Sequence, residues 1–280
     1  MTVNVSERPR AVHGGERPVR SRDPGWRIVA EQECRDLWVS GRGPVLVFAF
    51  SVLLSVMTYL AGTNQVLNFL EQREAVNLTL QVAVAVGVLV TLVVSADAIS
   101  GERERGTLES LLLTPVSRRA IVMGKLVAAL SLWLATFLVS VPYVWVLGRG
   151  VSIVGPAILL GLLVGTLLAV ALSALGLLIS ALSSSNKVSL AVCFFLLLAL
   201  FAPTQLPGGG PKGWFGDMLV RLNPVGAALR YLTAVVVNGH DWTRDLSYLV
   251  SPLVTAVLAG GALVIAGSRI VRLHGGVSGE

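Results

Sequence analysis

One apolar stretch decides the fold of this chain: residues 153–182 are IVGPAILLGLLVGTLLAVALSALGLLISAL. This stretch holds no charged residue, and it exceeds the roughly 20 helical residues that cross a hydrocarbon core of about 30 Å. Five further stretches are apolar over a comparable length, and Lys125 is the one charged residue among them. They are residues 44–62, 78–96, 121–147, 188–206 and 248–267. The sequence therefore predicts an all-α integral membrane protein with six transmembrane helices, in a domain over residues 44–273.

The composition also favours lipid as the main solvent. The residue types AVILMFWYC make up 54% of the chain, DEKR make up 14%, and the mean hydropathy is +0.76. A soluble domain has roughly 25% charged residues. The two cysteines, Cys34 and Cys193, lie in separate segments without the spacing of a metal site. These numbers exclude a soluble globular domain, a disordered chain and a disulfide scaffold.

The distribution of basic residues predicts the orientation in the membrane. An even number of spans places both termini on one side. Most Lys and Arg residues flank the predicted spans on that side, which the positive-inside rule assigns to the cytoplasm. The other side holds Arg73, Arg149, Lys212, Arg221, Arg230 and Arg244. We therefore expect a multi-pass protein of the cytoplasmic (inner) membrane with both termini cytoplasmic, and no nucleic-acid partner.

The segments outside the spans have distinct patterns. Residues 1–22 are rich in Arg, Pro and Gly and predict a disordered cytoplasmic tail, and residues 274–280 form a second tail. Residues 23–43 carry apolar side chains at helical spacing and predict an amphipathic helix in the membrane interface, with Trp26 and Trp38 in the headgroup layer. A solvated helix beside the membrane is the alternative.

The predicted spans lack the groups that chemistry or ion coupling needs. Every Asp, Glu and His lies outside them, so we expect no proton relay, no catalytic residues and no metal site. The pair Gly124 and Lys125 is followed by Leu126 instead of Ser or Thr, so it is not part of a P-loop. The sequence thus predicts a chain that is not an enzyme, binds no cofactor itself and depends on an external energy source.

Polar residues concentrate between the second and third predicted spans, in residues 97–120. We expect a turn at Gly106, a short helix capped by Thr107 and ended by Pro115, and Ser117 as the cap of the third span. An apolar face beside a charged rim is typical of a docking helix, and also of a helix folded onto lipid. The residues expected to contact a partner are Glu102, Glu104, Arg105, Gly106, Thr107, Leu108, Glu109, Leu111, Leu112 and Pro115.

Small residues recur every four positions along the fourth predicted span. Gly161, Gly165 and Ala169 lie on one helix face, and such a stripe lets a neighbouring helix approach closely. We expect it to be a helix-packing surface, not a binding site.

The polar loop resembles that of type-2 ABC transporter permeases, which include the nitrous-oxide-reductase accessory and daunorubicin-type efflux permeases. The family pattern is Glu-x-Glu-x-Gly-Thr-Leu-Glu-x-Leu, followed by Pro and by a more distant Gly-Lys. It is met at Glu102, Glu104, Gly106, Thr107, Leu108, Glu109, Leu111, Pro115, Gly124 and Lys125. The similarity extends to the order of segments over residues 24–273.

This resemblance implies a function that the residues alone leave open. Residues 97–120 would hold a coupling helix docked on a separate ATP-binding subunit, which carries ATP and Mg. A second permease half would complete an exporter of an unidentified substrate; by default it is an identical copy, and the alternative is a sibling permease. In the outer loop, residues 207–247, Asn223 and Pro224 are expected as the cap and first residue of a helix. The resemblance implies two short helices here that re-enter the outer leaflet, and a surface helical hairpin is the alternative. The alternatives are a secondary carrier and a non-transporting membrane anchor or mechanotransmitter.

Overall fold

The computed structural model describes residues 25–63, 72–107, 116–201, 214, 218 and 221–269. The predicted tails, 1–22 and 274–280, lie outside these residues. Every regular element in the described residues is helical. The elements are α1 (Gly25–Val39), α2 (Arg42–Thr63), α3 (Gln72–Glu104), α5 (Arg118–Leu147), α6 (Val154–Leu182), α7 (Asn186–Phe201), α9 (Pro224–Val236), the short 3-10 helix η3 (Leu246–Leu249) and α10 (Val250–Arg269).

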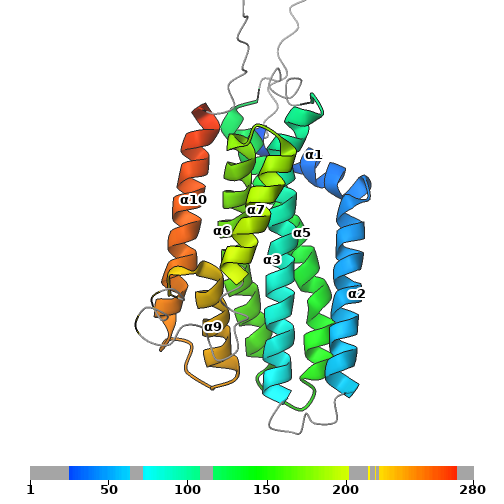
Figure 1. The fold of residues 1–280 in the computed structure, drawn as a ribbon. Coiled ribbons are helices and arrows are strands. Elements are labelled where there is room, and N and C mark those ends of the chain that lie inside the picture. Colours follow the sequence, from blue (N-terminus) through cyan, green and yellow to red (C-terminus); the bar gives the residue numbers. More distant parts are fainter. Residues whose placement is uncertain are drawn as a thin grey trace, which may run out of the picture.

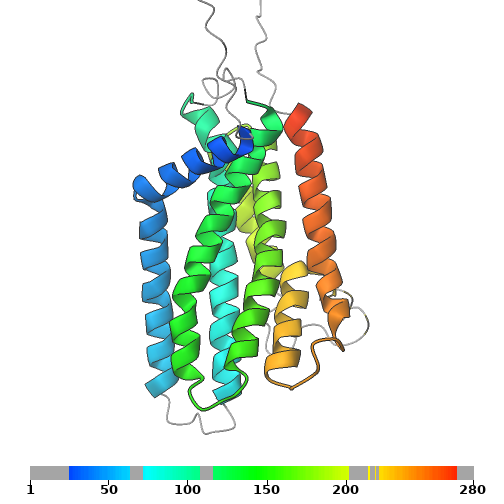
Figure 2. The same ribbon diagram turned by 180° about the vertical axis from the view of Figure 1, so that it is seen from behind.

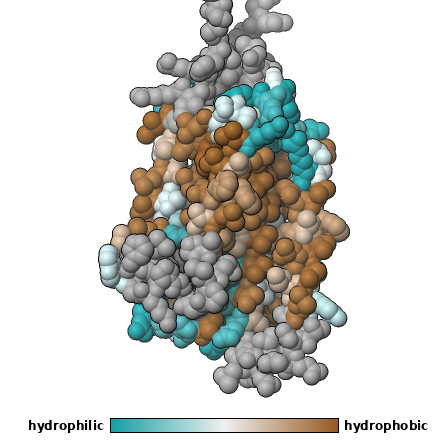
Figure 3. Space-filling view, in the orientation of Figure 1, coloured by the Kyte–Doolittle hydropathy of each residue, from teal (hydrophilic) through white to brown (hydrophobic). Residues whose placement is uncertain are grey.

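The long helices run alongside one another as a bundle (Figure 1). Helix α1 runs across one end of the bundle, and α9 lies toward the opposite end (Figures 1 and 2). We refer to these as the α1 end and the α9 end. Apolar side chains cover the middle of the visible face and hydrophilic ones gather toward both ends (Figure 3), as expected for a bundle surrounded by lipid.

Five helical stretches in the described residues are long and apolar enough to cross a membrane: α2, α3, α5, α6 and the continuous pair of η3 and α10. The predicted span 188–206 corresponds to α7, which has 16 residues and a length of about 24 Å. Residues 202–206 of that span lie outside the described part of the chain. The fold is therefore an all-helical membrane protein with five long apolar helices and shorter ones between them.

Local sequence signals mark several helix boundaries. The Ser117 hydroxyl accepts a hydrogen bond from the backbone N–H of Ala120 and caps α5. At α9, the Asn223 side chain accepts from the two backbone N–H groups of Val225 and Gly226, and Pro224 is the first helical residue. Both caps confirm the sequence prediction, because side-chain oxygens satisfy N–H groups that have no partner within the helix.

The core is formed by residues of α3, α5, α6, α7 and α9 and includes Trp133 of α5, whose side chain is fully buried. Its ring lies close to the Cα atoms of Gly87 in α3 and Gly165 in α6, where any added Cβ would clash with the ring. The indole N–H donates to the Thr166 hydroxyl at 3.0 Å. In the same way, Gly161 leaves room for Leu80. Glycines thus admit a large aromatic ring between closely packed helices.

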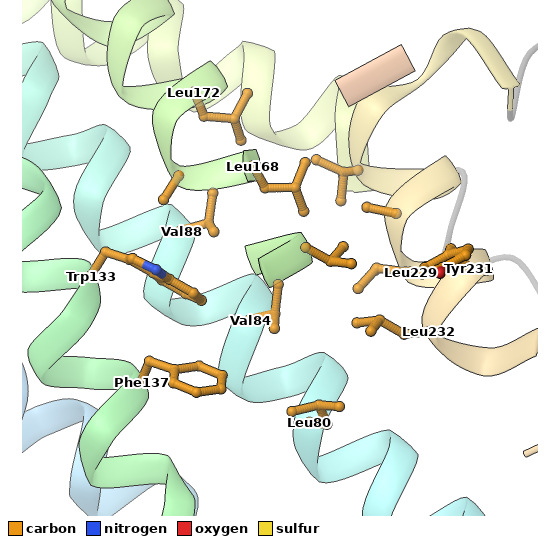
Figure 4. Packing of buried hydrophobic residues seen from close by; sticks show 14 of the residues in the cluster. Leu80, Val84, Val88, Trp133, Phe137, Leu168, Leu172, Leu229, Tyr231 and Leu232 are labelled. Carbon is orange, nitrogen blue, oxygen red and sulfur yellow. The ribbon is translucent and has the colours of Figure 1, made fainter. Parts of the chain in front are cut away.

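Helix α9 is packed into the body of the bundle, not onto its surface. Nearly all of its residues are buried, and it contacts α3, α6, α7 and α10. Leu229, Tyr231 and Leu232 point toward the residues of α3 and α6 that complete the core (Figure 4). Hydrogen bonds add to this packing: the Gln81 amide of α3 donates to the Thr233 hydroxyl at 2.7 Å.

Candidate functional site

The α1 end of the bundle holds the residues that precede the predicted coupling helix. Helix α3 ends there in a Schellman motif: the N–H of Thr107 donates to the Glu102 carbonyl, and the N–H of Gly106 donates to the Arg103 carbonyl. Gly106 has φ +71°, a left-handed conformation that favours glycine. The turn predicted at Gly106 is thereby confirmed, and it ends α3.

The two residues after Glu102 bind the connection between α6 and α7. The Arg103 guanidinium donates to the backbone carbonyls of Ser183 and Ala181 at the C-terminal end of α6. A cation at this end satisfies carbonyls without a helical partner and opposes the helix dipole. The next residue, Glu104, accepts from the backbone N–H of Asn186, the first residue of α7. Successive residues of α3 thus reach two further helices.

A second group of charges surrounds Asp97, one turn nearer the middle of α3. One carboxylate oxygen lies 3.5 Å from Arg42 at the start of α2 and 3.5 Å from Arg105. The other accepts a 2.7 Å hydrogen bond from the Asn186 side chain. The arginines are about half exposed, so these ion pairs contribute little free energy. They nevertheless place α2, α3 and α7 around one carboxylate.

Lys125 of α5 forms the most buried charged contact at this end. Its ammonium lies 2.7 Å from Oε1 of Glu33 in α1 and 2.5 Å from Oε1 of Glu102 in α3. The Lys125 side chain is only 1% exposed. A buried ammonium is tolerated only when it is paired, so these two carboxylates are required for its position. We call this group of three side chains the Lys125 triad.

Gly124, the residue before Lys125, explains why α1 reaches the triad. An added Cβ at this glycine would lie 2.6 Å from the Val29 side chain and 2.9 Å from the backbone nitrogen of Ala30. Val29 and Ala30 are the buried residues of α1. The adjacent pair in α5 therefore has two roles: the glycine allows close packing of α1, and the lysine binds its carboxylate.

The predicted tryptophans of α1 have different environments. The indole N–H of Trp38 donates to the Ser131 hydroxyl of α5 at 3.2 Å, whereas Trp26 is 42% exposed. Beside α1 lies a cavity of about 540 Å³, whose lining includes Glu33, Asp97 and Lys125. The charged groups of the α1 end therefore border open space instead of a closed core.

The structure describes only part of the predicted partner-binding set. Glu104, Arg105, Gly106 and Thr107 are exposed, and Glu102 is half-buried in the Lys125 triad. The remaining members lie outside the described residues: Leu108, Glu109, Leu111, Leu112 and Pro115. In the helix-packing set, Gly161 lies against Leu80 and Gly165 lies against Trp133, while Ala169 is buried in the core.

Sequence reasoning missed the partners of Lys125 and Asp97. It counted Glu33 only among the acidic residues outside the predicted spans, and Lys125 as a charge near the start of a span. The available signal was the isolation of Lys125, the one charge within the predicted apolar stretches, because an ammonium at such a position needs a carboxylate partner. Within the described residues, no group of His, Cys, Asp and Glu could hold a metal ion.

These features define a class of protein: a multi-pass helical membrane protein whose charged side chains link the helices at one end of the bundle. The comparisons identify the family. The family model described as ABC-2 family transporter protein matches residues 27–266, and the chain belongs to this family. A comparison with curated proteins finds no match.

Family membership establishes the general role of the chain. It is a membrane subunit of an ABC transporter. Such subunits lack ATPase activity, so the family implies an ATPase partner. The resemblance predicted from the loop is confirmed at the level of the family.

Proposed function

We propose that this chain is the permease half of an exporter that couples ATP hydrolysis on a separate subunit to outward movement of a substrate. The carrying observation is the Schellman turn that ends α3 at the α1 end. Helix α5 begins at the same end (Figure 1), so residues 108–115 connect two long helices there. In this proposal that segment is the coupling helix and docks on the ATPase, which binds ATP and Mg.

Charged residues next to the segment would set its docking register. Glu104 and Arg105 are exposed and, with Glu109, would face the ATPase, while the leucines 108, 111 and 112 would supply the apolar anchor. Glu102 contacts Lys125 in this structure. Its role in docking would therefore be indirect: it would fix the end of α3, from which residues 108–115 continue, against α5.

Helices α3 and α5 would transmit movement of the coupling helix to the membrane-spanning part of the bundle. These helices have 33 and 30 residues, and thus lengths of about 50 and 45 Å. Their packing around Trp133 favours motion as one body, since close-packed cores are not continuously deformable. Rocking of two such halves would open the pathway to one side and then to the other.

The complete assembly is proposed to have six spans per chain, with α7 and residues 202–206 as the fifth, and both termini cytoplasmic. A homodimer is proposed because closed twofold assemblies are the commonest. The resemblance of the polar loop supports grouping the chain with the nitrous-oxide-reductase accessory and daunorubicin-type permeases, and this grouping is part of the proposal. Apolar spans favour a hydrophobic or amphiphilic substrate over free ions.

Reconstitution tests the proposal directly. The chain is placed in nanodiscs alone and with an ATPase subunit that co-purifies with it, and ATP turnover is measured. Sealed vesicles with and without the ATPase then report movement of a panel of fluorescent amphiphiles. We expect transport only with the ATPase and ATP. Transport driven by an ion gradient without the ATPase would instead show a secondary carrier, and ATPase binding without any transport would show an anchor.

A charge reversal tests the docking surface. Glu104→Arg combined with Glu109→Arg should abolish co-purification of the ATPase, because like charges would then face the partner's complementary surface. The matched control is Arg149→Glu, an exposed residue in the turn between α5 and α6, which should leave the complex intact. Unchanged complex formation by the double variant would refute the docking assignment.

A further inference from the structure

The Lys125 triad is an unusual way to hold three helices together. Burying an ammonium carries a desolvation penalty, and replacing buried ion pairs by apolar residues is often neutral or stabilising. Lys125 is nevertheless the one charged residue of α5 beyond Arg118 and Arg119, and its side chain is 1% exposed. Stability alone thus gives little reason for a lysine here, whereas fixing the relative position of three helices does.

The geometry makes Lys125 the link between α1 and α3. Helix α1 packs mainly on α5, with a smaller contact on α2. Glu33 and Glu102 are both acidic and both use their Oε1 atoms for the same ammonium. The second oxygen of Glu102 is buried without a hydrogen-bond partner among the described residues. Without Lys125, these two carboxylates would repel each other.

Other contacts hold α1 on α5 independently of the triad. Val29 and Ala30 pack against Gly124, and Trp38 donates to Ser131. Removal of the Lys125 charge should therefore leave α1 attached to the bundle. What is lost is the connection from α1 to Glu102, five residues before the Schellman turn closes at Thr107.

We propose that Lys125 is a positioning residue that transmits motion of the coupling segment to α1, so that α1 moves with the spans when the ATPase acts. This inference rests on the proposed function, because it assigns a route for the force that the ATPase applies. The adjoining cavity of about 540 Å³ leaves the three side chains room to exchange partners as α1 moves. Lys125 acts through Glu33 and Glu102 and contacts no substrate.

The native cysteines provide a reporter on α1. Cys34 is next to Glu33 and partly exposed, whereas Cys193 is buried, so a nitroxide reagent should modify Cys34 selectively. The labelled chain is reconstituted with the ATPase in nanodiscs, and the electron paramagnetic resonance spectrum is recorded without nucleotide and with ATP and Mg. Unlabelled protein in sealed vesicles gives the transport per ATP hydrolysed.

The compared variants are Lys125→Arg and Lys125→Met. The native chain and the Arg variant should show a nucleotide-dependent spectral change, because a guanidinium can bind both carboxylates. The Met variant should lose that change and most of its transport per ATP, yet still bind the ATPase. If Lys125→Met does not fold, the triple variant with Glu33→Gln and Glu102→Gln replaces it, since it carries no unpaired charge and lacks the link.

Two results separate this inference from the proposed function. If the native complex transports and the Met or triple variant keeps both the spectral change and the transport per ATP, the role of Lys125 is refuted while the exporter proposal stands. If the native chain does not bind the ATPase or does not transport with ATP, the proposed function fails and the inference fails with it.

Discussion

The two ends of the bundle are stabilised by different kinds of contact. At the α1 end, charged side chains connect helices: Lys125 binds two carboxylates and Asp97 lies between two arginines. At the α9 end, α9 itself is held by apolar burial and by neutral hydrogen bonds such as that from Gln81 to Thr233, and the 2.7 Å pair of His240 and Asp245 lies within the loop that follows it. An ion pair depends on both charged partners and, where it is exposed, on salt, whereas apolar packing involves no charge that salt could screen. The comparison indicates that the contacts of the α1 end can rearrange, whereas the packing of α9 is fixed.

The largest predicted effect is at the Lys125 triad. Lys125→Ala should lower the free energy of unfolding by about 4 kcal/mol, because it leaves two partly buried carboxylates without their cation. Chemical unfolding in nanodiscs measures this. The control is Lys187→Ala at the exposed start of α7, expected to change stability by less than about 0.5 kcal/mol. Equal effects of the two substitutions would remove the basis for treating Lys125 as a buried, paired charge.

The second largest predicted effect tests whether α9 is held by apolar packing. Leu232 is fully buried in α9, and Leu232→Ala should cost about 3 kcal/mol through lost burial and the resulting cavity. Leu253 in α10 is exposed, so Leu253→Ala serves as the control and should cost much less. The Leu232 effect should be the same at low and high salt. A strong salt dependence would contradict a purely apolar attachment of α9.

The N-terminal caps of α9 and α5 allow the same type of contact to be compared at the two ends. The Asn223 side chain accepts from two N–H groups of α9 and also donates to the Leu200 carbonyl at 2.6 Å, whereas Ser117 accepts one bond of 3.3 Å at α5. Asn223→Ala should therefore cost about 2 kcal/mol and Ser117→Ala about 0.5 kcal/mol. The measurement is the unfolding midpoint of each variant, and the reverse order would contradict the comparison.

The smallest effect concerns the exposed ion pair of the α1 end. Arg42→Gln should change stability by less than about 1 kcal/mol at low salt, since the Arg42 side chain is 60% exposed and such pairs are screened. The difference from the native chain should vanish near 1 M salt, where the Debye length is about 3 Å. A difference that persists in high salt would show that Arg42 acts through packing and not through its charge.

Much of the fold follows from local sequence signals. Apolar length predicts α2, α3, α5 and α6, because a helix in lipid must satisfy its own backbone and present apolar side chains. Short-range chemistry predicts the cap at Ser117 and the turn at Gly106, since both depend on residues within one helical turn. The proposed fifth span differs: α7 ends at Phe201 in the described residues, and hydropathy alone does not distinguish a full span from a shorter helix.

The contacts of the candidate site were less predictable because they join distant segments. Glu33 and Lys125 are 92 positions apart, and no periodicity links them. The same holds for Asp97 and Asn186, separated by 89 positions. The burial of α9 within the bundle was not predicted, because its sequence suits both a helix that re-enters the outer leaflet and a surface hairpin. The leucines 108, 111 and 112 remain a prediction, since they lie outside the described residues.

The consecutive charges at the end of α3 have a consequence for how this segment tolerates change. Neighbouring residues on a helix project about 100° apart. Accordingly, Glu102 contacts α5, Arg103 binds the last carbonyls of α6, and Glu104 binds the first backbone amide of α7. The order of these three residues therefore matters, because each one contacts a different neighbouring helix. Exchanging Glu102 with Arg103 would preserve composition and net charge, yet would present each neighbour with the wrong sign.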